Sequence, residues 1–141
     1  MLIIMPKQVK WIFAILLLMI AKKLISQISN CLKNEPGIKL AYVLGSSITG
    51  RVKKDSDFDL VLVLDHQDEA EYEHFYNLLS KINLPKDLDL SLVDKNSSPL
   101  FLFQIIDTGV CVYQQSEQER VLFTAFVLRN YYDNAHIRNI Y

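Results

Sequence analysis

Three aspartates at predicted strand positions are the side chains best placed to do chemistry. Asp57 and Asp59 are two residues apart at the start of a predicted strand. Their side chains therefore point to one face, with Cα atoms about 6.7 Å apart. Asp89 lies in the alternating segment 87–93 (DLDLSLV), whose leucines face one way and whose aspartates face the other. If these two strands are neighbours in a sheet, the three carboxylates converge.

Three converging carboxylates predict a site for hard cations. Two carboxylates about 4 Å apart repel each other by about 4 kcal/mol at an effective dielectric of 20. A cluster of three therefore needs cations between its members. Ligand sets made only of oxygen select Mg²⁺ or Mn²⁺ rather than Zn²⁺. We expect Asp57, Asp59 and Asp89 to be both metal ligands and catalytic residues, with two Mg²⁺ ions between them.

A tight turn before the carboxylates has the features of a phosphate-binding site. Gly45 and Ser46 follow the apolar segment 40–44 (LAYVL), which predicts a buried strand. Backbone amides in such a turn form a nest for phosphate oxygens, and the Ser46 hydroxyl adds a donor. Arg51 supplies positive charge a few residues later. Gly45, Ser46 and Arg51 are therefore the predicted nucleotide-binding residues, beside a metal site suited to phosphoryl or nucleotidyl transfer.

The spacing of these residues resembles that of a known family. Gly45-Ser46, ten residues and then Asp57-x-Asp59, with a further aspartate on a later strand, is similar to the polymerase-beta-like nucleotidyltransferase superfamily. Size and layout resemble the minimal nucleotidyltransferases, which are antitoxin partners of HEPN-domain toxins. The resemblance covers residue 21 to the end, including GSSITGRVKKDSDFDLVLVL, LDLSLVD and TGVCVYQ. The chain departs from the family at Ser47, where an arginine is common.

The resemblance implies a specific reaction and partner. An antitoxin of this family would use ATP to transfer AMP to a tyrosine of its cognate HEPN toxin, a ribonuclease. Two other functions remain open from the sequence. One is a non-catalytic antitoxin that acts by stoichiometric binding, and the other is a nucleotidyltransferase that modifies a small molecule.

The elements that position these residues alternate along the chain. Apolar periodicity predicts helices at 21–33, 69–82, 99–106 and 116–134, and strands at 40–44, 58–65, 87–93 and 110–113. Ser116 with Glu119 three residues later has the pattern of a helix capping box. The expected fold class is α/β (α+β), with a small mixed β-sheet flanked by helices. We expect one nucleotidyltransferase domain at 21–141.

Composition limits the partners that the protein can have. The 15 basic and 16 acidic side chains give a net charge of −1, whereas proteins that bind duplex nucleic acid are usually basic. Stable binding to duplex nucleic acid is therefore not expected. Cys31 and Cys111 have no ligand or redox spacing, so we expect reduced thiols and a cytoplasmic protein.

The first 20 residues form an apolar extension that has three interpretations. Residues 11–21 read WIFAILLLMIA, which is apolar on every side of a helix. A membrane span needs about 20 such residues, so a membrane location is not favoured. Three interpretations remain open: a helix buried against the body or a partner, a weak membrane anchor, or the product of a start codon placed too early. Translation from Met19 would give a conventional amphipathic first helix.

Overall fold

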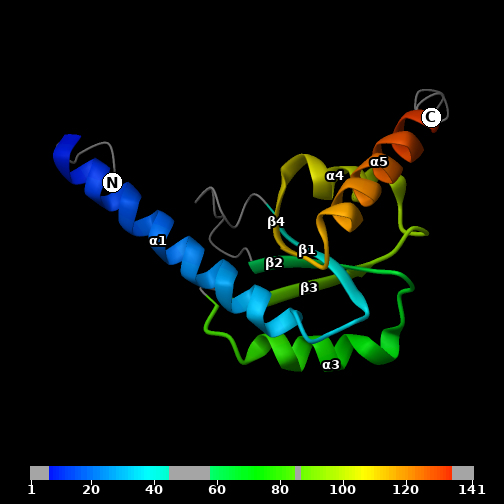
Figure 1. Cartoon of the computed structure of the whole chain (residues 1–141), viewed down its shortest axis with the longest axis horizontal. Helices are drawn as coiled ribbons and strands as arrows, with labels where there is room; N and C mark the ends of the chain where they lie inside the picture. Colours follow the sequence, from blue (N-terminus) through cyan, green and yellow to red (C-terminus); the bar gives the residue numbers. More distant parts are fainter. Residues whose placement is uncertain (1–6, 45–57, 85–86, 135–141) are drawn as a thin grey trace.

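The computed structural model describes residues 7–44, 58–84 and 87–134, which form helices around one sheet (Figure 1). The helices are α1 (Lys7–Leu32), α3 (Glu69–Ser80), α4 (Pro99–Thr108) and α5 (Glu117–Asp133), and the strands are β1 (Ile38–Leu44), β2 (Phe58–Leu64), β3 (Leu88–Val93) and β4 (Gly109–Gln114). The predicted α+β fold with a small mixed sheet is confirmed. Each predicted helix and strand is present.

The four strands form one mixed sheet in the order β3-β2-β1-β4. β1 is antiparallel to both β2 and β4, while β2 and β3 run parallel. In consequence β1 ends at the same end of the sheet at which β2, β3 and β4 begin. β2 is an interior strand and is buried on both faces beyond Asp59, as its continuous apolar sequence predicts.

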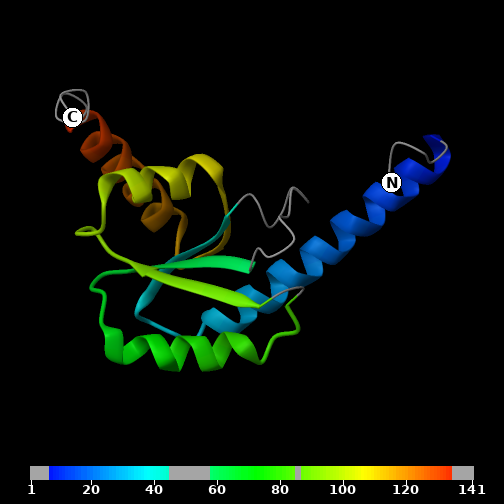
Figure 2. The same cartoon turned by 180° about the vertical axis from the view of Figure 1, so that it is seen from behind.

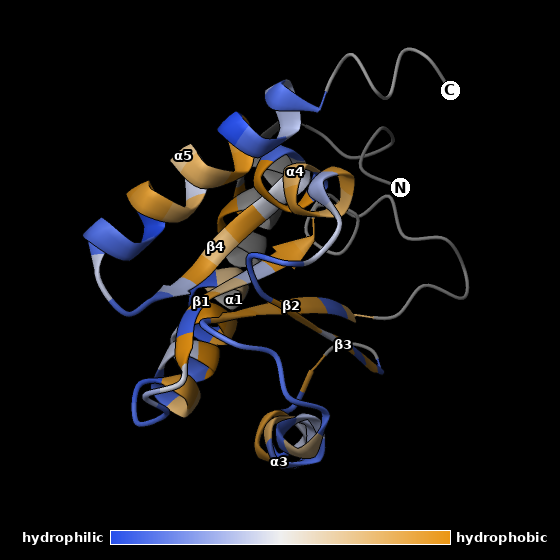
Figure 3. Ribbon diagram, turned by 90° about the vertical axis from the view of Figure 1, so that its right-hand side faces the viewer, coloured by the Kyte–Doolittle hydropathy of each residue, from blue (hydrophilic) through white to orange (hydrophobic). Residues whose placement is uncertain are grey.

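Helices cover both faces of the sheet, so there are two apolar cores (Figures 2 and 3). α1 and α3 lie on one face, where the core includes Ile28, Leu60, Leu62, Phe75 and Leu90. α4 and α5 lie on the other face, where the core includes Leu40, Val61, Val93, Ile105 and Val127. The strict alternation of β2 sends Leu60 and Leu62 to the first core and Val61 and Val63 to the second.

Local signals set the starts of the helices that follow the strands. Ser116 is the N-cap of α5, and its hydroxyl accepts a hydrogen bond from the backbone N–H of Glu119 at 3.1 Å, as the capping pattern predicts. Asp68 caps α3 by accepting from the N–H of Ala70. α4 begins with Pro99, whose missing N–H is not needed in the first turn.

α1 begins earlier than the sequence analysis expects. Its C-terminal part packs on the body through Leu24, Ile25, Ile28 and Leu32, which recur at helical spacing. Its N-terminal part projects away from the rest of the domain (Figure 1), and Ile12, Ile15 and Met19 are exposed there. These three side chains therefore do not pack on the body. Among the residues that the structure describes, no helix has the length and apolarity needed to cross a membrane.

Candidate active site

Two of the predicted catalytic aspartates stand side by side. β2 and β3 are parallel neighbours, and their register pairs Asp59 directly with Asp89. The backbone N–H of Phe58 donates to the carbonyl of Asp87 at 2.7 Å, which fixes this register where the two strands begin. Paired residues of adjacent strands point to the same face and have Cα atoms about 4.8 Å apart. The tertiary structure thus brings together two carboxylates that are 30 positions apart in the sequence.

The Asp59–Asp89 pair lies on the face of the sheet that α4 and α5 cover. Asp59 is two residues before Val61, which belongs to the core under these helices. Asp89 is four residues before Val93, which belongs to the same core. Side chains of a strand alternate between the two faces of the sheet with a period of two. Asp59 and Asp89 therefore lie on the same face as Val61 and Val93, just beyond the part of that face that α4 and α5 cover. Asp59 is half-buried and Asp89 is exposed, so the pair lies at the margin of the core, within reach of solvent.

The remaining predicted site residues, Gly45, Ser46, Arg51 and Asp57, lie outside the described residues. The described strand ends nevertheless fix where their segment attaches to the sheet. The β1–β2 register pairs Val43 with Leu60. Continued by one residue, it places Leu44 opposite Asp59. The segment 45–57 therefore leaves and rejoins the sheet beside the Asp59–Asp89 pair.

The donor chemistry of this end of the sheet fits a hard cation. Asp59 and Asp89 offer only carboxylate oxygens, which suit Mg²⁺ and Mn²⁺ better than a thiolate- or imidazole-seeking ion. Within residues 7–44, 58–84 and 87–134, no group of three or more His, Cys, Asp and Glu side chains is placed to hold a metal. The third predicted ligand, Asp57, is outside these ranges.

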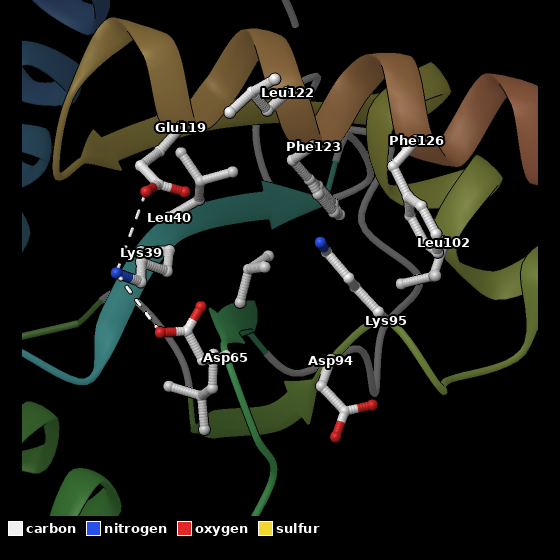
Figure 4. A pocket seen from close by; sticks show the side chains of 12 residues that line it. Lys39, Leu40, Asp65, Asp94, Lys95, Leu102, Glu119, Leu122, Phe123 and Phe126 are labelled. Carbon is white, nitrogen blue, oxygen red and sulfur yellow. Dashed lines mark ion pairs between the residues drawn. The ribbon is translucent and has the colours of Figure 1, made fainter.

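A small pocket at the opposite end of the sheet is not the site of this chemistry (Figure 4). It is lined by Asp65 and Asp94, which follow the last residues of β2 and β3 and lie about 20 Å along β2 from Asp59 and about 17 Å along β3 from Asp89. The ammonium group of Lys39 lies at this end of the sheet and forms ion pairs with the carboxylates of Asp65 at 3.3 Å and Glu119 at 3.9 Å. The volume of the pocket, about 110 Å³, is too small for a nucleoside triphosphate.

Asp94, directly after the last residue of β3, is a buried structural residue. Its side chain is 8% exposed. Its carboxylate accepts hydrogen bonds from the backbone N–H groups of Gln67 at 2.9 Å and Asn96 at 2.8 Å, so it joins the loops after β2 and β3. The bond from Gln67 is the main reason that the pKa of Asp94 is lowered. The segment Asp94-Lys95-Asn96-Ser97 has the composition of an Asx-turn, which is the only local signal for this role.

Aromatic and cysteine side chains on the α4–α5 face are structural. Tyr131 stacks on Phe103, with ring centroids 3.9 Å apart, and so packs α5 against α4. Tyr132 is exposed instead. Burial raises the pKa of Tyr42 to about 12 and also raises the pKa of the Cys111 thiol. Cys111 and Cys31 are both free thiols, as expected.

Solved structures with the same fold come from toxin–antitoxin complexes. A mutant of the MntA–HpeT toxin–antitoxin aligns with a TM-score of 0.66 and 21% identity, over 82% of this chain and 94% of that chain. A toxin–antitoxin with AMP-PNP aligns at 0.61 and 21%, over 82% and 94%. The tri-AMPylated Shewanella oneidensis HEPN toxin in complex with MNT antitoxin aligns at 0.60 and 21%, over 83% and 92%. Identity at this level shows the fold alone.

Sequence comparison assigns the family directly. A search of curated protein sequences finds no match. The family model described as polymerase beta, nucleotidyltransferase matches residues 26–118, which is more than half of the chain. The matched range contains β1, β2 and β3, and with them every predicted site residue. The chain belongs to the polymerase beta nucleotidyltransferase family, and the prediction that it is a nucleotidyltransferase is confirmed.

Proposed function

We propose that this protein is a magnesium-dependent antitoxin that transfers AMP from ATP to a tyrosine of a HEPN-domain toxin. The observation that carries the proposal is the register of Asp59 with Asp89 at the end of the sheet where segment 45–57 attaches. This arrangement in a member of a nucleotidyltransferase family provides adjacent carboxylates next to the predicted phosphate turn. The protein partner is suggested by the complexes in which similar folds were solved.

Each predicted residue has a distinct task in this proposal. Asp57 and Asp59 would hold one ion at the triphosphate, and Asp57, Asp59 and Asp89 would share a second ion on the acceptor side. Bound magnesium would neutralise phosphate charge and make an acceptor hydroxyl more acidic. Gly45 and Ser46 orient the phosphates through backbone and hydroxyl donors, and Arg51 adds positive charge.

Asp89 is the carboxylate best placed to assist removal of the acceptor proton. It is the exposed member of the pair, whereas Asp59 is half-buried. An acceptor side chain arriving from another protein therefore meets Asp89 before it meets Asp59. A positioned base of this kind contributes about 10²- to 10⁴-fold to the rate.

Two of the similar structures support the choice of donor and reaction. One toxin–antitoxin was solved with AMP-PNP, an ATP analogue, and another complex contains a tri-AMPylated HEPN toxin. These observations belong to those proteins. They motivate ATP as the donor and a toxin side chain as the acceptor for the present chain.

The test is to incubate the purified protein with ATP, Mg²⁺ and a HEPN-domain protein offered as its partner, and to weigh that partner by mass spectrometry. We expect the partner to gain mass in steps of one AMP unit, with the modification mapped to tyrosine. A chelator should prevent the gain. If the protein neutralises the toxin in growing cells while the toxin mass never changes, the protein acts by stoichiometric binding and the enzymatic proposal is wrong.

A further inference from the structure

The projecting half of α1 carries exposed apolar side chains on the side that faces away from the domain. Ile12, Ile15 and Met19, here called the α1 stripe, are 53%, 40% and 61% exposed. They are spaced by three and four residues, so they lie along one side of the helix. Ile12 lies about 160° around the helix from Ile28, which is buried in the core under α1 and α3. Figures 1 and 2 show that this half of α1 extends beyond the sheet and the other helices.

The same side of α1 becomes polar where the helix reaches the domain. Lys22 and Lys23, three and four residues after Met19, are exposed, and so are Ser26 and Asn30 farther along the helix. Polar side chains of this kind are what the water-facing side of a helix normally carries. The change from apolar to polar therefore occurs within one continuous helix, at the point where the domain begins to cover its other side. The residue types of the projecting half suit an apolar environment instead of water.

The sequence of the projecting half indicates which apolar environment this is. Residues 11–21 read WIFAILLLMIA, and a helix with this sequence has no polar side over about three turns. A groove on a partner protein covers one side of a docked helix and leaves the opposite side in water, whereas a lipid layer surrounds a helix on every side. The run is about 16 Å long, which is roughly half of the 30 Å hydrocarbon core. It can therefore be immersed in one leaflet but cannot span the bilayer.

The charge of this part of the chain is complementary to an anionic lipid surface. Residues 1–34 contain no Asp or Glu and five basic side chains, namely Lys7, Lys10, Lys22, Lys23 and Lys33. The remaining residues, 35–141, contain 10 basic and 16 acidic side chains and therefore have a net charge of −6. An anionic surface thus attracts the N-terminal segment and repels the rest of the domain. Lys10 and Lys22 flank the apolar run, and lysine side chains at both ends of an immersed helix can extend to the lipid phosphates.

We propose that the projecting half of α1 binds reversibly to an anionic lipid surface. The helix lies in the plane of one leaflet, with the α1 stripe among the acyl chains and the flanking lysines at the phosphates. This association is independent of the transfer reaction and would hold the domain beside the membrane. Because the segment is short, we expect half of the protein to be bound at an accessible lipid concentration on the order of 0.1–1 mM.

Co-sedimentation of the full chain with lipid vesicles tests the proposal. The protein should pellet with vesicles of phosphatidylcholine that contain about one third phosphatidylglycerol, and each lysine at the phosphates should strengthen this binding about fivefold over pure phosphatidylcholine. Trp11 is the only tryptophan of the chain and belongs to the apolar run. Its fluorescence should therefore shift to shorter wavelength when the anionic vesicles are added, which reports immersion of this segment directly.

Substitutions in the α1 stripe locate the binding segment. Ile15→Glu and Met19→Glu should each weaken vesicle binding about tenfold or more, since an apolar contact is lost and a charge is added. Leu100→Glu is the matched control, because Leu100 is 49% exposed on α4, and it should bind as the wild type does. Circular dichroism checks that each variant is folded.

Several results would overturn the proposal. It is wrong if the full chain does not pellet with anionic vesicles, if the emission of Trp11 is unchanged, or if both stripe variants bind as well as the wild type. Equal binding to pure phosphatidylcholine would refute the role of the lysines. If the protein ignores vesicles but forms a dimer in analytical ultracentrifugation that Ile15→Glu breaks, a second copy covers the α1 stripe and lipid does not.

Discussion

Asp89→Asn separates the chemical role of this carboxylate from any role in folding. Asp89 is paired in register with Asp59, and its side chain is exposed. The substitution keeps the size of the side chain and removes one negative charge. Asp87→Asn is the matched control, because Asp87 is an exposed aspartate two residues earlier, on the same alternating face. The sequence analysis assigns no chemical role to Asp87.

The expected magnitudes follow from the geometry of the pair. Two carboxylates about 4.8 Å apart repel by about 3 kcal/mol at an effective dielectric of 20. Because Asp89 is exposed, solvent screening reduces this to about 1 kcal/mol or less. In the absence of metal, Asp89→Asn should therefore leave the free energy of unfolding unchanged or raise it slightly. Transfer of AMP should instead fall by about 10²- to 10⁴-fold, because a positioned base is lost.

Two measurements decide between these expectations. Urea unfolding in the presence of a chelator gives the stability of wild type, Asp89→Asn and Asp87→Asn. Transfer of labelled AMP and binding of a fluorescent ATP analogue then give the rate and the nucleotide affinity with Mg²⁺ present. Nucleotide binding should persist in Asp89→Asn, since Asp57 and Asp59 are expected to hold the triphosphate ion. Asp87→Asn should match the wild type in all three assays.

Transfer by Asp89→Asn within a factor of about three of wild type would contradict a role for Asp89 in proton removal. A large loss of stability in metal-free Asp89→Asn would equally contradict the expected repulsion between Asp89 and Asp59. If Asp87→Asn lost transfer to the same extent, the role in removing the acceptor proton would have been assigned to the wrong aspartate.

Three further predictions concern the metal, the N-terminus and Asp94. Nucleotide binding, measured by calorimetry, should require Mg²⁺ or Mn²⁺. Asp57→Asn or Asp59→Asn should abolish AMP transfer while the protein stays folded. Transfer by either variant would show that these aspartates are not the metal ligands. A chain that begins at Met19 should keep the urea midpoint of the full chain, because Ile12 and Ile15 are exposed while the packed part of α1 is retained; loss of folding would show that the projecting part is structural. Asp94→Asn should lower the free energy of unfolding by about 1–3 kcal/mol near neutral pH, since Asp94 accepts two backbone hydrogen bonds. The pKa of Asp94 is lowered by folding, so this stabilisation is present above the unfolded pKa of about 3.9 and is lost as the pH falls through the folded pKa. Urea unfolding near neutral pH and near pH 3 measures this change, and a difference between variant and wild type that is independent of pH would contradict it.

The helices and strands of this protein could be predicted from its amino-acid sequence, and the same patterns give the residue types expected at its site. Alternating and continuous apolar runs depend on local backbone geometry, so β2, β3 and the helices follow from side-chain periodicity alone. The capping pattern at Ser116 is also local and predicted the start of α5 correctly. Period-two alternation predicts that Asp89 and Ser91 lie on the face opposite Leu88 and Leu90. The structure agrees, because Leu88 and Leu90 pack in the core under α1 and α3, while Val93, on the same face as Asp89, packs in the core under α4 and α5.

Side-chain periodicity does not reveal which elements pack together, because packing is a non-local property of the fold. Asp59 and Asp89 can meet only if β2 and β3 are neighbours, and the parallel pairing of these strands, with its register, brings the two residues together. Asp94 is a polar residue in a loop-forming segment, and its burial depends on the approach of the loop that contains Gln67. How much of α1 is packed depends on where β4 and α3 lie against it. The sequence cannot give this, since a helix that is apolar on every side gives no indication of which side is covered.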